Sequence, residues 1–109
     1  MLTLSIRYTI DPNKFNDFKE YVEAELEPIR KSGGKIVGYF YPTEFSGATN
    51  EALGLIDFPS LAEYEVYRKA LADDPGHKRS VTRLQQSGAV IAMNRSILER
   101  AQSSNSVQS

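Results

Sequence analysis

Residues 33–58 constrain the fold of this chain more than any other stretch. Two β-rich runs, 33–45 and 51–58, flank a short loop of small and polar residues at 46–50. This arrangement is typical of a β-hairpin. Both runs carry apolar residues on both faces, which predicts central strands that are covered on each side. Because a lone hairpin is only marginally stable in water, this one needs further strands and a covering layer of helices.

The two ends of the chain supply the further strands. Residues 1–10 alternate apolar and polar side chains, which predicts a strand with one apolar face and one mixed polar face. Arg7 is the only charged residue of that strand and lies on its polar face. A second apolar run predicts the last strand at residues 89–98.

Local signals predict a first helix between these strands. Asp11 and Pro12 open it, because Asp caps free N–H groups and Pro lacks a donor that the first turn does not use. Gly33 and Gly34 end it. Pro28 lies inside the pattern and predicts a kink or a break near the end of the helix. Its buried stripe is Phe15, Phe18, Val22, Leu26 and Ile29.

Two shorter helices are predicted after the hairpin. Ser60 and Glu63 fit a capping box that opens the second helix. Asp74 and Pro75 open the third, and Gly88 ends it. The inward stripe of the second helix is expected at Leu61, Tyr64, Tyr67 or Arg68, and Leu71.

The order of these elements is β-α-β-β-α-β with a split second helix, which is the ferredoxin-like plan with a four-stranded antiparallel sheet, an α+β fold. Such a sheet has one face covered by helices and one bare face. Here the bare face carries large apolar side chains, which predicts a homodimer, or a higher even-numbered homo-oligomer, with sheets face to face. The domain is expected to span residues 1–99, and the Ser- and Gln-rich residues 100–109 to form a flexible tail.

Composition excludes several classes of function. The 109 residues carry a formal net charge of −1, which gives no electrostatic case for nucleic-acid binding. There is no cysteine, so disulfides, thiolate catalysis and cysteine metal sites are excluded. No apolar run approaches the roughly 18 residues of a membrane helix, and the N-terminus lacks the layout of a signal peptide. A cytoplasmic location is the default expectation.

Several short motifs are shared with one known family. They are residues 7–14, residues 33–39 and residues 57–63, followed by Arg68 and residues 73–77. In their order and spacing, the chain from about Leu2 to Leu98 resembles the NIPSNAP family. The resemblance implies a dimeric α+β barrel built on a ferredoxin-like fold, and no firmly settled activity. The family often has an aromatic residue, commonly Trp, where Phe58 and His77 stand here, so roles assigned to those aromatics do not carry over.

His77 is the first candidate for a functional site. It is the only histidine, and it is expected as the third residue of a helix beside an apolar stripe. A neutral imidazole there could act as a base or as a hydrogen-bond donor, or it could be a polar residue without a chemical role. One histidine makes no convincing metal site, and Asp73 and Asp74 are interpreted as residues that mark the ends of helices. Neither a metal nor a cofactor is expected.

Arg7 and the tyrosines complete the candidate set. Arg7 could hold a ligand carboxylate, or it could form an ion pair with Glu44 or Asp57 across the sheet. Tyr39 and Tyr67 belong to an aromatic interior that could line a pocket for a flat organic molecule or simply fill a core. The predicted ligand-binding residues are therefore Arg7, Tyr39, Tyr67 and His77, and the catalytic candidates are His77 and Arg7.

Three hypotheses on function remain open from the sequence. The first is a dimeric domain that binds a small hydrophobic or aromatic molecule, or a protein partner, without turnover, since no paired catalytic set is evident. The second is a cofactor-independent monooxygenase or isomerase, with His77 or a tyrosine as base and Arg7 stabilising developing negative charge. The third is a structural dimer module without a ligand.

Overall fold

The chain folds as the predicted sequence of strands and helices. A computed structural model describes residues 1–45 and 47–101. A single 3₁₀ turn, Pro12–Lys14, precedes the first α-helix. In chain order, the other elements are β1 (Leu2–Ile10), α1 (Phe15–Ser32), β2 (Lys35–Phe40), β3 (Glu51–Phe58), α2 (Leu61–Asp73), α3 (Pro75–Ser87) and β4 (Val90–Glu99).

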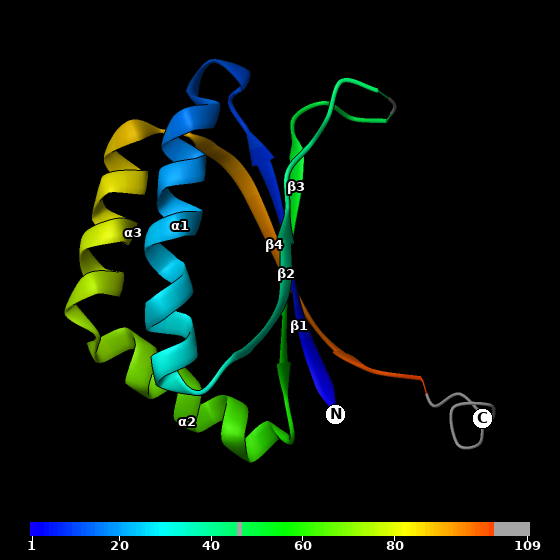
Figure 1. The fold of residues 1–109 in the computed structure, drawn as a ribbon, viewed down its shortest axis with the longest axis vertical. Coiled ribbons are helices and arrows are strands. Elements are labelled where there is room, and N and C mark those ends of the chain that lie inside the picture. The colour runs from blue at the N-terminus through cyan, green and yellow to red at the C-terminus, as the bar shows by residue number, and fades with distance from the viewer. Residues whose placement is uncertain (46, 102–109) are drawn as a thin grey trace.

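The four strands form one antiparallel sheet in the order β2-β3-β1-β4. In its central register, Leu4 of β1 lies opposite Ile56 of β3 and Ile97 of β4. Figure 1 shows this sheet nearly edge-on, with all three helices on one side and no element on the other. The predicted ferredoxin-like α+β fold with a split second helix is therefore confirmed. In the part of the chain that the structure describes, no helix combines the length and apolar content needed to cross a bilayer.

The core lies between the sheet and α1. Alternation turns every second side chain of β1 toward the helices, and the first helix meets them with the predicted stripe at spacings of three and four residues. The rings of Tyr8 and Phe18 pack edge to face with centroids 4.9 Å apart. The fully enclosed members from these two elements are Leu4, Ile6, Tyr8, Ile10, Phe18, Val22 and Ile29.

The predicted helix signals act as side-chain caps. Ser60 Oγ accepts the Glu63 N–H at 3.3 Å, and Asp74 Oδ1 accepts the His77 N–H at 3.0 Å. Asp11 caps the 3₁₀ turn rather than the α-helix itself. Pro28 neither ends nor interrupts α1, which continues to Ser32, so the alternative of a break is wrong.

Two sequence predictions of burial are wrong. The strand β2 lies at an edge of the sheet rather than in its centre, and Phe40 is 50% exposed on it. A bulge at Val37 and Gly38 interrupts its pairing with β3. Leu61, expected on the inward stripe, is 55% exposed because the buried face of α2 is formed by Tyr64 and Tyr67. In both cases, an apolar residue was assigned to the core where no neighbouring layer covers it.

Arg100 and Ala101 are the described residues of the predicted tail. The Arg100 backbone N–H donates to the Met1 carbonyl at 3.3 Å, next to the first strand. The prediction of a flexible segment otherwise falls on residues 102–109, which lie outside the described residues.

Gly34, which directly precedes β2, is predicted to be intolerant of a methyl group. A Cβ there would lie 2.9 Å from Cγ2 of both Ile29 and Ile56, which are fixed in the core. We expect Gly34→Ala to lower the free energy of unfolding by about 1–3 kcal/mol, as overpacking does. Gly38→Ala is the matched control, because its Cβ would meet only the half-exposed ring of Phe40, which can turn away. Urea denaturation measures both variants, and equal losses would contradict this account.

Candidate functional site

A cavity of about 170 Å³ lies between the helices and the sheet. Its floor is apolar and includes Ile29 and Ile56, which are 2% and 0% exposed. Polar groups reach it from α1, α2, α3, β2 and β4. They are Tyr21, Glu25, Tyr39, Tyr67, Arg68, His77 and Arg95.

Three of the four predicted ligand-binding residues meet in this cavity. Tyr39, Tyr67 and His77 all line it, although they come from β2, α2 and α3. Arg7 does not. It lies opposite Leu53 and Asn94 on the bare face of the sheet, because it alternates with Ile6 and Tyr8, which face the helices.

The predicted ion pair of Arg7 is also absent. Asp57 is paired with Arg100, whose Nη2 lies 2.8 and 2.9 Å from the two carboxylate oxygens. Thr3 Oγ1 donates to the same carboxylate at 2.6 Å. Among residues 1–45 and 47–101, Arg7 forms no ion pair with Glu44 or any other acid.

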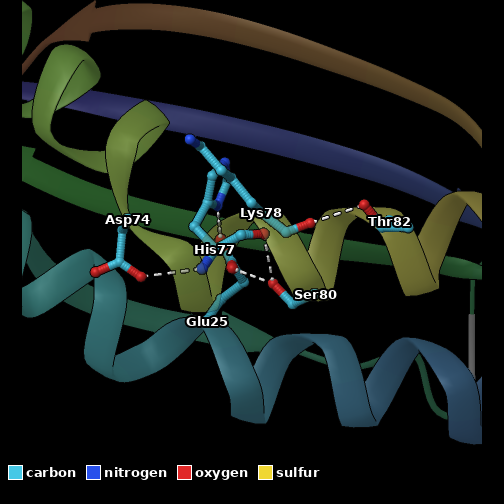
Figure 2. A network of polar contacts seen from close by, with 6 residues as sticks. All are labelled: Glu25, Asp74, His77, Lys78, Ser80 and Thr82. Atoms are coloured by element: carbon cyan, nitrogen blue, oxygen red, sulfur yellow. Dashed lines mark hydrogen bonds and ion pairs between the residues drawn. The ribbon is translucent and has the colours of Figure 1, made fainter.

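The distinctive group of the cavity is a buried carboxylate. Glu25 projects from α1 toward α3 and is 2% exposed. Its Oε1 lies 2.8 Å from His77 Nδ1, and Ser80 Oγ donates to its Oε2 at 2.5 Å (Figure 2). Burying a carboxylate is costly unless it is hydrogen-bonded, and these two partners meet that need.

This contact sets the tautomer and the orientation of His77. With Nδ1–H donating to Glu25, the neutral imidazole carries its free lone pair on Nε2. The side chain of His77 is 21% exposed, so the ring is held from inside and remains accessible. Carboxylates orient catalytic and metal-binding histidines in the same way.

The cap at the start of α3 holds the backbone of His77 in place. Asp74 caps the helix through the His77 N–H and pairs with Lys31 Nζ at 2.9 Å. The hydrogen bond from Lys31, together with that backbone N–H, holds the pKa of Asp74 below its usual range. Asp74 therefore stays ionised and serves as a helix cap, as the sequence predicted for this residue.

The tyrosines of the interior are not bases. Burial raises the pKa of Tyr8, Tyr21, Tyr39 and Tyr67 far above the usual value of 10.0. Their hydroxyls remain protonated near neutral pH and act as hydrogen-bond donors and acceptors. Of the two bases that the sequence suggested, a tyrosine is therefore disfavoured, and His77 remains the candidate.

Two arginines border the cavity. Arg68 of α2 donates to the Tyr64 hydroxyl at 3.3 Å. Arg95 of β4 lies opposite Ile6, on the side of the sheet that carries the helices. Within the described chain, neither forms an ion pair with an acidic side chain.

Sequence reasoning missed Glu25 and Arg95, but each left a signal. Glu25 follows Val22 by three residues and precedes Ile29 by four, so it lies on the buried stripe of α1. Arg95 lies between Met93 and Ile97 at alternating positions of β4. A charge at an apolar position of a regular pattern indicates a polar environment at that point of the fold.

A second depression, of about 380 Å³, lies at the other end of the molecule. It is formed by the hairpin loop and the start of the first helix, and Ile10, Pro12, Phe15 and Phe45 contribute to it. Among the described residues that line it, Glu44 is the one ionisable group, so these residues offer no pair of groups for acid–base chemistry. We therefore place the candidate site at Glu25 and His77. No group of three His, Asp or Glu residues suited to a metal ion occurs within the described ranges.

The fold and the cavity define a class of protein, the ferredoxin-like α+β domain with a cavity between helices and sheet. Solved structures share this fold. A NIPSNAP domain protein from Burkholderia xenovorans has 20% identity and a TM-score of 0.78, over 93% of this chain and 95% of that one. A NIPSNAP family protein from Agrobacterium tumefaciens has 22% identity and a TM-score of 0.79, over 93% and 88%. A putative antibiotic biosynthesis monooxygenase from Nitrosomonas europaea has 9% identity and a TM-score of 0.70, over 94% and 100%.

The family follows from the sequence itself. The NIPSNAP family model matches residues 4–105, nearly the whole chain. The chain therefore belongs to the NIPSNAP family, as its motifs suggested. No curated protein sequence matches it.

Ser80 is predicted to contribute strongly to stability. Ser80→Ala removes a donor from the buried Glu25 carboxylate, which should lower the free energy of unfolding by about 1–3 kcal/mol. Thr82→Ala is the matched control on the same helix, because Thr82 is exposed and bonds only the Lys78 carbonyl (Figure 2). Its effect should stay within about 0.5 kcal/mol. Thermal denaturation at neutral pH compares the two, and a larger loss in Thr82→Ala would be incompatible with this interpretation.

Proposed function

We propose that this protein is a small-molecule enzyme that transfers protons without a cofactor, with His77 as the general base. The observation that carries the proposal is the 2.8 Å contact between the buried Glu25 carboxylate and His77 Nδ1. The hypothesis of binding without turnover depended on the lack of a paired catalytic set. The Glu25–His77 pair supplies such a set and favours the isomerase form of the second hypothesis.

The reaction class follows from the groups in the cavity. His77 Nε2 takes a proton from a carbon next to a carbonyl group. The electron pair of the C–H bond forms a C=C bond, and the π electron pair of the carbonyl group moves to its oxygen. The ring becomes an imidazolium, whose positive charge the Glu25 carboxylate offsets. In a β,γ-unsaturated carbonyl compound the enolate is conjugated with the second C=C bond. Return of the same proton to the γ carbon then gives the α,β-unsaturated isomer, so the atoms and electrons balance without a further reactant.

The enolate formed in this step needs stabilisation. The protonated hydroxyls of Tyr39 and Tyr67 line the same cavity and are hydrogen-bond donors there. Arg95 adds a positive charge at the same site. Arg7, which was expected in this role, lies on the other face of the sheet.

The volume limits the substrate. The cavity of about 170 Å³ is close to the roughly 150 Å³ of an apolar cavity that holds benzene, and below the roughly 300 Å³ typical of sites for drug-sized ligands. This size favours a substrate of one ring or less and argues against larger flat molecules. The fold shared with the putative monooxygenase from Nitrosomonas europaea gives no information on the chemistry of this chain, because function depends on the site and not on the fold.

Hydrogen–deuterium exchange tests the proposed base. In D₂O, the protein should accelerate exchange of the methyl protons of pyruvate or acetone, two small carbonyl compounds, as followed by proton NMR. His77→Gln should reduce this acceleration about 100-fold, the lower range of general-base contributions. The control is Lys78→Gln, on the neighbouring exposed position of α3. Acceleration that survives His77→Gln, or that neither compound shows, would refute the proposal.

We also propose that two copies pair through the bare face of the sheet. Apolar side chains on this face come from β2, β3 and β4, and Phe40 and Leu98 are each 50% exposed. Leu53 and Leu55 lie between them on β3, opposite Arg7 and Ser5. An apolar surface contributed by three strands is typical of a self-association interface.

Sedimentation velocity tests the pairing. At micromolar concentration, the protein should sediment with twice the chain mass, and Leu55→Lys should give the single-chain mass, because a lysine in an apolar interface is left desolvated. Val66→Lys is the control, since Val66 is 67% exposed on α2 and distant from the bare face. A single-chain mass for the unaltered protein would overturn the proposed dimer.

A further inference from the structure

We infer that the ligand of the His77 cavity carries a carboxylate group, which Arg95 binds at the mouth of the cavity. This inference rests on the proposed function, because it takes the same cavity as the working site. It adds the chemical class of the ligand and the direction in which the ligand lies.

Glu25, the acidic residue that lines the cavity, already has partners. Glu25 accepts hydrogen bonds from His77 and Ser80. Arg95 forms no ion pair with any acid in residues 1–45 and 47–101, although it borders the cavity. An arginine at an apolar position of a strand, beside an enclosed cavity and without a protein carboxylate, is suited to an external one.

The balance of charge favours a monoanion. Apart from His77 and the tyrosines, the ionisable groups that line the cavity are Arg68, Arg95 and Glu25. Two positive charges and one negative charge leave a single positive charge. One carboxylate neutralises it, whereas a cation would add to it and a neutral molecule would leave it uncompensated.

The position of Arg95 relative to the tyrosines supports its participation. Its positive charge acts on the hydroxyl of Tyr67, where it opposes the effect of burial on the pKa. It acts in the same sense on Tyr8 and Tyr21. These effects agree with the place of Arg95 among the lining residues and with its exposure, which put it at the border between the cavity and solvent.

The difference in exposure between the lining residues predicts how the ligand lies in the cavity. Arg95 is exposed, whereas Ile29 and Ile56 at the floor are almost fully buried. The carboxylate of the ligand then lies at the mouth, in the planar fork of the guanidinium group, and its apolar part lies on the floor beside His77. A ring of benzene size fits the volume of about 170 Å³.

Benzoate and benzamide test the inference, because they share one shape and differ in charge. Binding is followed by NMR shifts of the His77 ring protons at millimolar ligand. We expect benzoate to bind at least tenfold more tightly than benzamide, and Arg95→Gln to weaken benzoate about tenfold without changing benzamide, the loss expected for a charge-assisted hydrogen bond. Arg83→Gln, on the exposed face of α3, is the control for a general effect of charge and should leave both unchanged.

Several results would overturn the inference. They are the absence of benzoate binding, equal binding of benzamide, and an equal loss in Arg83→Gln and Arg95→Gln. The exchange measurement separates this inference from the proposed function. Charge-dependent benzoate binding without catalysed proton exchange would support the carboxylate site and refute the proposed enzyme. Equal His77-dependent exchange in acetone and in pyruvate would support the enzyme and refute the carboxylate site.

Discussion

A carboxylate enclosed between two helices is the interaction on which this structure depends most. Removing a charged group from water costs several kcal/mol unless other groups replace its hydrogen bonds. Glu25 meets this requirement with His77 and Ser80, both from α3. The same contacts join α3 to α1 and hold the imidazole ring in one orientation. Stability and the proposed chemistry therefore share a single set of hydrogen bonds.

The sheet separates two environments with different chemistry. Successive side chains of a strand point to opposite faces, so Ile6 belongs to the helix-covered side while its neighbour Arg7 belongs to the bare side. For the same reason Arg95, which lies opposite Ile6, reaches the cavity that Arg7 cannot reach. The bare side instead contains the pairing of Asp57 with Arg100, close to the apolar side chains through which we propose that two copies associate.

Much of the fold was predictable because its signals are local. Alternation in residues 1–10, a stripe at helical spacing from Phe18 to Ile29, and caps at Ser60 and Asp74 each depend on a few neighbouring residues. The errors concern cover by distant layers. An apolar run cannot reveal whether a strand lies at the centre or at the edge of a sheet, so the exposure of Phe40 on β2 was not foreseen.

The sequence by itself determined the elements and their order, and through shared motifs the family. It also indicated His77, Tyr39 and Tyr67 as members of the candidate site. Only the tertiary structure decided which charged groups meet them. Glu25 and His77 are 52 positions apart, and their contact depends on how two helices pack against each other. Local pattern carries no information on that packing, because the free energy that brings distant segments together comes from the burial of the whole core.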